Sequence, residues 1–283
     1  MNSVMARLVT IVVFACGTFA VASELPTTAT QSDIDPLVAD GAVEDGAVTG
    51  LSVSQAVKDR DTGWNDLAAE MRMVIRNKRG RERERKIRIR TLEQLEDGNK
   101  TLMVFNSPPD IRGTALLSFT HIASDDDQWL YLPALKRVKR ISGSGRSGPF
   151  VGSEFSFEDL SSFEVEKYEH ELLRREMLGE TPCFVVKQDP IDKDSGYSQR
   201  VVWIDENQYL MRKVEFFDTR DRRLKTLEYD GYEQYDDRFW RPGTMTMINH
   251  QTGASTDLHW SNYQLNTGLD AGQFNKGALQ RAR

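Results

Sequence analysis

The side chains that usually carry out acid–base, nucleophilic or metal chemistry are scattered along this chain without a catalytic spacing. No two histidines form a metal-binding pattern such as a pair one helical turn apart. No nucleophile elbow and no phosphate-binding loop occurs, and no pair of carboxylates stands out. We therefore expect no catalytic activity, metal or cofactor, although a site assembled from distant residues stays an alternative. The histidines are His121, His170, His250 and His259.

Three glycines, Gly143, Gly145 and Gly148, match the dinucleotide-binding fingerprint letter for letter. That fingerprint needs a strand before it and a helix that opens on its last glycine. Here Pro149 follows, and the neighbouring strands are predicted to be antiparallel. The segment is therefore predicted to be a flexible loop, and no nucleotide site is expected.

The spacing of Asp192, Asp194 and Gly196 is similar to the start of a calcium-binding loop. The glycine falls one place early, and Trp203 stands where such a loop needs a bidentate glutamate. The prediction for this segment is a surface turn.

The first 22 residues have the pattern of a secretory signal. Arg7 provides an early positive charge, residues 8–14 form an apolar run, and Ala20-Val21-Ala22 provides a cleavage site. The apolar run is too short for a membrane-spanning helix, which needs about 20 residues. We expect a cleaved signal and a periplasmic protein; the alternative is a lipoprotein signal with lipid attachment at Cys16.

Cleavage leaves Cys183 as the one cysteine, so no intrachain disulfide can form. The removed segment carries one arginine and no acid, so the formal net charge changes from −6 to −7. An acidic chain argues against a nucleic-acid partner. Cys183 itself is predicted to be a small buried hydrophobic side chain.

Residues 23–50 differ in composition from the rest. Their charged residues are all acidic, and Ala, Thr, Val and Gly are frequent without a periodic apolar face. This composition is typical of a flexible linker or a disordered terminus. The folded domain is predicted to span residues 51–283, with a short capped helix near residues 52–57.

From Trp64 onward, apolar residues recur with period two, which indicates strands with one buried and one solvated face. Met71, Met73 and Ile75 share one face, as do Ile87 and Ile89. Short turn segments join the strands without long helices between them, so the sheet is predicted to be antiparallel. Further strands are predicted at residues 101–106, 114–121, 128–132, 138–141, 183–188, 198–204, 209–217, 224–232, 244–249 and 256–263.

Residues 142–175 interrupt this pattern and are predicted to be a loop with a short helix that covers one end of the sheet. Gly143 and Gly145 lie in its Gly/Ser-rich start and are a candidate hinge. Phe155 and Phe157 are predicted to lie on the lid itself. The remaining helices are too few to cover the sheet, so it closes on itself or leaves an apolar face open to a ligand.

Two runs of basic residues, Arg81–Arg90 and Lys136–Arg146, have two interpretations. In one, they contact anionic lipid head groups, with each cation contributing about 1 kcal/mol. In the other, they form a solvated outer face that resists edge pairing. The pattern leaves both open.

Three segments, Gly113–Leu117, Trp129–Ile141 and Gly152–Leu160, give the chain a resemblance to the LolA/LolB-like superfamily, in its outer membrane lipoprotein-sorting protein branch. The resemblance implies a mainly β fold, in which a curved antiparallel sheet forms an open half-barrel with short lid helices. It also implies a periplasmic carrier that shields the acyl chains of a lipid or lipoprotein between envelope membranes. An inner-membrane RND or ABC transporter is a candidate partner, and a monomer is expected.

The family motifs assign no cargo-contacting residue, so the predicted groove rests on strand alternation. For residues 103–105, 129–131 and 203 both faces of the strand are apolar, and the pattern does not decide which one faces the groove. The alternative function is an accessory module that docks on an RND-type transporter, with the barrel filled by its own side chains. The predicted groove residues are Met71, Met73, Ile75, Ile87, Ile89, Met103, Phe105, Trp129, Tyr131 and Trp203.

Overall fold

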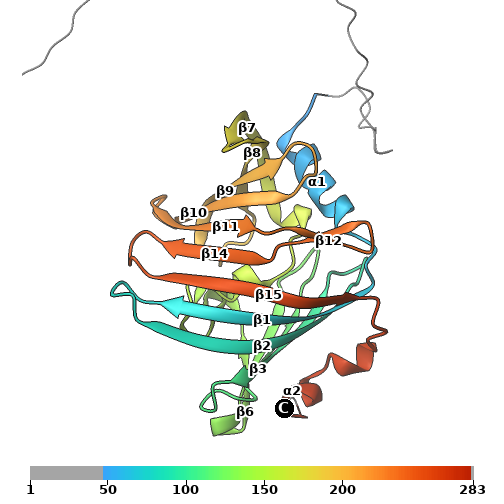
Figure 1. The fold of residues 1–283 in the computed structure, drawn as a ribbon, viewed down its shortest axis with the longest axis vertical. Helices are drawn as coiled ribbons and strands as arrows, with labels where there is room; N and C mark the ends of the chain where they lie inside the picture. The colour runs from blue at the N-terminus through green and yellow to red at the C-terminus, as the bar shows by residue number, and fades with distance from the viewer. Residues whose placement is uncertain (1–46, 282–283) are drawn as a thin grey trace, which may run out of the picture. The chain divides into compact units, whose positions relative to one another are not determined.

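An antiparallel sheet of 13 strands dominates the computed structural model, which describes residues 47–281 (Figure 1). The strand order is β6-β5-β4-β3-β2-β1-β15-β14-β11-β10-β9-β8-β7. The edge strands β6 and β7 do not pair with each other, so the sheet is an open half-barrel, as predicted. The predicted signal segment, Cys16 and residues 23–46 of the predicted linker lie outside the described residues.

Two meanders of consecutive antiparallel strands build the sheet, and the pairing of β15 with β1 joins them. The first meander contains β1 (Asp66–Arg76), β2 (Glu82–Leu92), β3 (Lys100–Ser107), β4 (Ala115–Phe119), β5 (Asp127–Leu132) and β6 (Arg137–Ile141). The second contains β7 (Tyr168–Leu178), β8 (Thr181–Pro190), β9 (Tyr197–Asp205), β10 (Met211–Asp218), β11 (Arg223–Asp230), β14 (Thr244–Asn249) and β15 (Ser255–Leu265). The short strands β12 (Glu233–Tyr235) and β13 (Phe239–Arg241) form a separate hairpin.

The concave face of the sheet carries the main hydrophobic core. Met71 on β1 lies opposite Ile87 on β2 and Trp260 on β15, and Ile87 lies opposite Phe105 on β3. Directly opposed residues of an antiparallel pair share a face, so these side chains form one apolar surface. Met71, Ile87 and Phe105 are at most 2% exposed.

The predicted insertion at residues 142–175 is shorter than expected, because β7 begins at Tyr168. As an edge strand, β7 carries many charged residues, which conceal its period-two pattern. The rest of the insertion contains four short 3₁₀ helices at Gly143–Ser147, Phe150–Gly152, Glu158–Leu160 and Val165–Lys167. We call residues 149–163 the lid.

Helix α1 (Gly50–Arg60) packs against β7 and β8. It begins at the last residue of the predicted linker, where Thr49 and Ser52 form a reciprocal capping box. Helix α2 (Lys276–Arg281) was not predicted and lies near the C-terminal end of the described chain (Figure 1). Within residues 47–281, no helix is long and apolar enough to cross a bilayer.

Two apolar clusters lie on the convex face of the sheet. In the first, Leu102, Leu117 and Trp129 pack beneath Phe274 and Leu279 of the C-terminal segment. The second contains Cys183, Val185, Val201 and Trp203. Cys183 is fully buried there, and burial raises the pKa of its thiol to about 11, so the predicted structural role of this cysteine is confirmed.

Candidate functional site

Two cavities lie between the concave face and the lid. Their volumes are about 390 Å³ and about 620 Å³. They share Met211, Tyr229 and Met245 on the sheet, and they share lid residues including Phe163. The two cavities therefore share part of their walls, on the sheet and on the lid.

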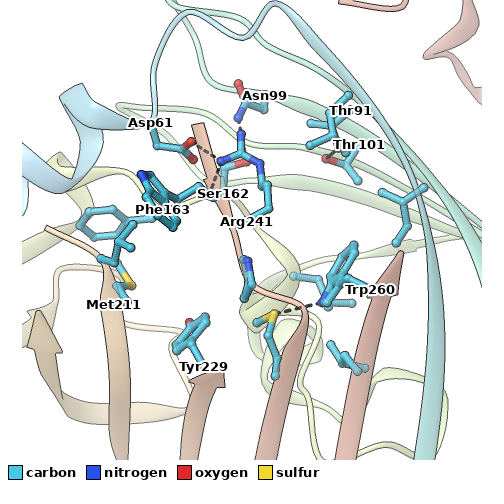
Figure 2. A pocket seen from close by; sticks show the side chains of 18 of the residues that line it. Asp61, Thr91, Asn99, Thr101, Ser162, Phe163, Met211, Tyr229, Arg241 and Trp260 are labelled. Carbon is cyan, nitrogen blue, oxygen red and sulfur yellow. Dashed lines mark hydrogen bonds and ion pairs between the residues drawn. The ribbon is translucent and has the colours of Figure 1, made fainter. Parts of the chain in front are cut away.

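The smaller cavity has an aromatic and thioether floor (Figure 2). The Trp260 ring stacks on Tyr263 with 5.8 Å between centroids, and the Trp260 Nε1 donates to Met245 Sδ at 3.3 Å. Tyr229 lines the same cavity, and burial raises the pKa of its hydroxyl to about 12. The cavity is therefore suited to an apolar ligand, and methionine adapts to ligands of varied shape.

Polar side chains gather at the rim of the smaller cavity, away from the floor. Asp61, at the end of α1, forms an ion pair with Arg241, and Thr91 and Thr101 bond through their hydroxyls at 3.2 Å (Figure 2). An apolar floor with a polar rim can bury a hydrocarbon chain and leave a polar end in water.

The lid fills the other part of the concave face with aromatic rings. Phe150 lies 5.6 Å from both Phe105 and Phe157, measured between ring centroids. Phe150 and Phe155 are at most 1% exposed. Over β1, β2 and β3, the lid therefore occupies the apolar surface that the sheet offers.

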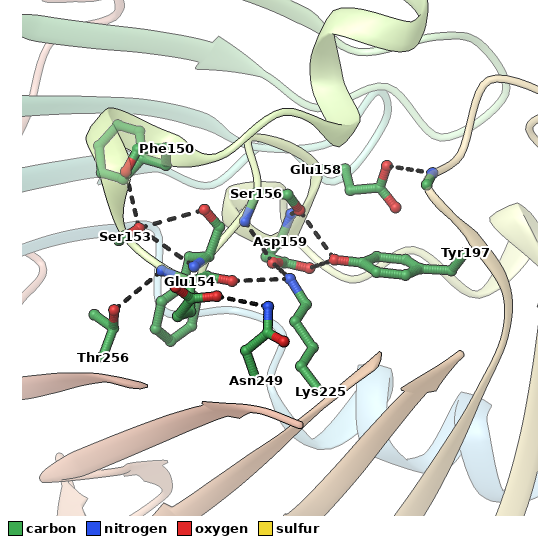
Figure 3. Close-up of polar contacts among 12 residues, drawn as sticks. Phe150, Ser153, Glu154, Ser156, Glu158, Asp159, Tyr197, Lys225, Asn249 and Thr256 are labelled. Carbon is green, nitrogen blue, oxygen red and sulfur yellow. Dashed lines mark hydrogen bonds and ion pairs between the residues drawn. The ribbon is translucent and has the colours of Figure 1, made fainter. Parts of the chain in front are cut away.

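A buried polar network holds the lid on the sheet (Figure 3). Lys225 on β11 donates to Asp159 Oδ2 at 2.6 Å, and both side chains are 4% exposed. The Tyr197 hydroxyl donates to Asp159 Oδ1 at 2.7 Å. Burial, followed by the charge of Asp159, raises the pKa of Tyr197 well above its usual value. We call Asp159, Tyr197 and Lys225 the latch.

Additional hydrogen bonds join the lid to neighbouring strands. The Glu154 backbone N–H donates to Thr256 at 3.0 Å, and Asn249 donates to the Glu154 carboxylate at 2.7 Å. Glu158 accepts bonds from Ser195 and from the Gly196 backbone, both at 3.0 Å. Polar lid residues thus form hydrogen bonds to the sheet and its loops, while Phe155 and Phe157 of the lid pack against the concave face of the sheet.

A serine–histidine pair occurs away from the cavities. Ser54 on α1 and His170 Nδ1 on β7 are 2.8 Å apart, and His170 Nε2 lies 2.9 Å from the Val165 carbonyl. Ser54 is fully buried, and neither residue lines the cavities beside the lid. The pair therefore joins α1 to the sheet and is closed to a substrate.

Three solved structures of bacterial proteins share this fold. An outer membrane lipoprotein-sorting protein domain from Vibrio parahaemolyticus is 50% identical, with a TM-score of 0.80 over 82% of this chain and 98% of its own. A DUF1329 family protein from Desulfovibrio piger is 28% identical, with a TM-score of 0.78 over 81% and 97%. A LolA superfamily protein from Nitrosomonas europaea is 20% identical, with a TM-score of 0.67 over 82% and 100%.

A model of an uncharacterized protein family also matches residues 97–281, and no curated protein matches the sequence. The identity to the Vibrio domain, over nearly all of that domain, decides the family. This chain belongs to the outer membrane lipoprotein-sorting protein family. The predicted resemblance to this branch is confirmed, and the LolA superfamily protein shares the fold.

In this member of the family, the predicted residues of β1, β2 and β3 all face the concave side. Ile89, Met103 and Phe155 line the smaller cavity. Ile75 lines a third cavity, at the hairpin that joins β1 and β2. The lid covers the remaining predicted residues of these strands, which are Met71, Met73, Ile87 and Phe105. Phe157 of the lid packs in the same cluster.

Three residues predicted for the groove face the other way. Trp129 and Tyr131 on β5 pack under the C-terminal segment, and Trp203 on β9 lies in the second convex cluster. Their placement in the groove was therefore wrong. Strands β5 and β9 are apolar on both faces because the convex face also packs against other residues, so alternation could not decide between the faces.

The C-terminal strands contribute cavity residues that the sequence analysis missed. They carry the same period-two signal, with Met245 and Met247 on β14 and Leu258 and Trp260 on β15. The pairing of β15 with β1 brings them beside the N-terminal strands, and that long-range pairing was not predictable from the local pattern.

The Gly/Ser-rich start of the insertion is tied down at Arg146. This side chain is 5% exposed and bonds to Asp192 at 2.6 Å, so Arg146 belongs to neither interpretation of the basic runs. Asp192 lies in the predicted surface turn, which is confirmed. Gly143 has a positive φ of 52°, which favours glycine, and the hinge role of Gly143 and Gly145 stays a prediction.

Proposed function

We propose that this chain is a periplasmic carrier that binds the acyl chains of a lipid or lipoprotein on its concave face and moves them between envelope membranes. The hollow beneath the lid supports this proposal most strongly, because its floor is apolar and its rim is polar. The name of the Vibrio relative, an outer membrane lipoprotein-sorting protein domain, agrees with such a cargo. We propose further that the carrier acts as a monomer and receives its cargo from an inner-membrane transporter.

The energetics of acyl transfer require a movable cover. Burying one CH₂ group contributes about 0.8 kcal/mol, so a sixteen-carbon chain gains roughly 12 kcal/mol relative to water. A bilayer offers the chain about the same free energy. The free energy of burying the chain in a carrier must therefore nearly match that in the bilayer without greatly exceeding it, or release becomes slow. Cargo that displaces Phe150, Phe155 and Phe157 of the lid offsets part of its own gain in free energy, which weakens binding toward this balance.

A charge placed on the shared floor tests the proposal. Met245→Arg puts a guanidinium where both cavities meet, so binding of a fluorescent fatty-acid probe should weaken by about tenfold or more. The control is Ile248→Arg on the same strand, because Ile248 is 40% exposed and faces the convex side. Equal affinities of the two variants, measured by fluorescence titration, would contradict binding on the concave face.

A further inference from the structure

A third cavity, of about 300 Å³, lies where the hairpin between β1 and β2 meets the tip of the lid. Ile75, Val151 and Gly152 provide its apolar and backbone walls. Its charged lining consists mainly of guanidinium groups. The charged residues are Arg76, Arg81, Arg83, Arg85 and Glu154.

Arg76 and Glu154 already have side-chain partners. Arg76 pairs with Glu82 at 2.6 Å and with Asp257, and Glu154 accepts a hydrogen bond from Asn249. In contrast, Arg81 and Arg83 form no ion pair within residues 47–281. The cavity therefore has an excess of positive charge.

Arg85 is the most buried of the unpaired arginines. It donates a hydrogen bond to the Val151 carbonyl of the lid and forms no ion pair within the described part of the chain. Burial lowers the pKa of Arg85, and the neighbouring Arg83 lowers it further. Two neighbouring guanidinium groups that repel each other are a ready site for an anion, because an anion removes the repulsion.

The arginines lie on the cargo face of the sheet. Arg83 is opposite Ile75, and Arg85 is opposite Met73, so both point to the concave side in line with Ile87 and Ile89. Arg83 and Ile89 are six positions apart on β2, which corresponds to about 20 Å along an extended strand. One face of one strand thus carries an apolar stretch that ends in a cationic cluster.

The lid tip above this cluster is held in an uncommon conformation. Val151 has φ 47° and ψ 36°, a left-handed conformation that β-branched residues rarely adopt. Such strain persists only where the surrounding contacts enforce it, and it is often found at ligand-binding positions. Here the Val151 carbonyl accepts a hydrogen bond from Arg85, and an anion in the cavity would replace this carbonyl as the acceptor.

We propose that the cluster of Arg81, Arg83 and Arg85 binds a phosphate-type anion, and that this anion is the headgroup of the carried amphiphile. Arginine is well suited to this ligand, because its planar guanidinium donates paired hydrogen bonds to phosphate oxygens. The assignment to a headgroup rests on the proposed acyl-carrying function; the anion site itself does not. The basic run of the sequence is thereby divided by face, with Arg83 and Arg85 toward the cargo and Arg88 and Arg90 on the convex side.

Two amphiphiles with the same chain test the site in the full mature protein. Dodecyl phosphate should bind about tenfold or more tightly than dodecyl maltoside, as expected for charge-assisted hydrogen bonds. The double variant Arg81→Gln, Arg83→Gln should lose this preference and keep its affinity for the maltoside. The matched control is Arg79→Gln, which changes a charge in the same hairpin but does not line the cavity; it should keep the preference.

Three results would overturn the proposal: equal binding of both amphiphiles, a preference that survives the double variant, or an equal loss of preference in the Arg79→Gln control. Competition by inorganic phosphate distinguishes the source. Displacement of dodecyl phosphate at millimolar concentration would assign the site to phosphate from any source, and no displacement would assign it to the headgroup of an anchored amphiphile.

The anion site and the carrier function can fail separately. If neither amphiphile binds the wild type, the acyl-carrying function fails. Phosphorus-31 NMR with inorganic phosphate alone then tests anion binding at the arginine cluster. Line broadening that the double variant abolishes supports the anion site, and the absence of line broadening overturns it.

Discussion

Lys225 and Asp159 bury opposite charges between the lid and β11, with 2.6 Å between Nζ and Oδ2. A buried ion pair adds little net stability compared with an apolar contact, but removing one partner leaves a charge without compensation. Lys225→Met should therefore weaken the attachment of the lid by about 3–5 kcal/mol. Relative to the wild type, hydrogen exchange of the lid amides should accelerate more than hydrogen exchange of the strand amides.

The control for this variant is Lys187→Met on β8, because Lys187 pairs with Glu171 and Asp189 at the surface. Surface pairs contribute about 0–1 kcal/mol, so exchange in the lid should not change. If Lys225→Met destabilised the sheet and left lid exchange as in the wild type, the latch would support the sheet alone.

We predict that His170 makes the attachment of α1 depend on pH. Burial lowers the pKa of His170, so the folded protein takes up a proton on this ring less readily than the unfolded chain. Its contribution is present above the ordinary histidine pKa of about 6.5 and is lost as the pH falls through the lower folded value. The free energy of unfolding should therefore decrease below about pH 6.5.

Urea denaturation at mildly acidic and neutral pH measures this effect. His170→Asn should show a smaller decrease on acidification than the wild type, and His259→Asn, on β15, should behave as the wild type does. An unchanged decrease in His170→Asn would assign the pH dependence to other groups.

Residue faces could be predicted only where one side of a strand is solvated. Ile87 and Ile89 alternate with exposed charged residues on β2, and their concave placement followed from the pattern. Trp129 and Trp203 sit in strands with two buried faces, where the pattern carries no such information. The latch could not be predicted either, because Asp159, Tyr197 and Lys225 are far apart in sequence.

At the scale of elements, the proposed carrier function requires the lid to compete with cargo for the concave face. Phe155 is 1% exposed and lines the smaller cavity, so Phe155→Ala should enlarge that cavity. Loss of a buried phenylalanine ring costs about 3–5 kcal/mol of stability. We expect a less stable protein that binds a fatty-acid probe more tightly than the wild type.

Phe274→Ala is the matched control, since Phe274 is also buried but covers the convex face. It should lower stability without changing probe affinity. Probe titration and urea denaturation of both variants check the prediction, and the same change in affinity in both would show that the lid does not compete with cargo.

Most strands were predictable, but the elements at the margins of the fold were not. Strand β7 is an edge strand whose charged residues conceal its alternation, and α2 is only six residues long, too short for a helical period to show. The lid was predicted as a cover, yet its 3₁₀ turns depend on contacts with the sheet and could not be read locally.

At the scale of the molecule, the fold explains why the chain has an apolar hollow at all. A half-barrel of 13 strands has more concave surface than its short helices and lid can cover. The sequence indicated this excess through many alternating strands and few helices. The order of the strands and the joining of β15 to β1 depend on long-range pairing, which a local pattern does not specify.

Lipid analysis of the native protein tests the carrier function most directly. The mature protein, purified from the periplasm and extracted with organic solvent, should yield a phospholipid, acyl chain or lipoprotein in a stoichiometric amount by mass spectrometry. An empty extract, together with no uptake of a fluorescent fatty-acid probe, would contradict the carrier and favour a module that docks on an envelope transporter.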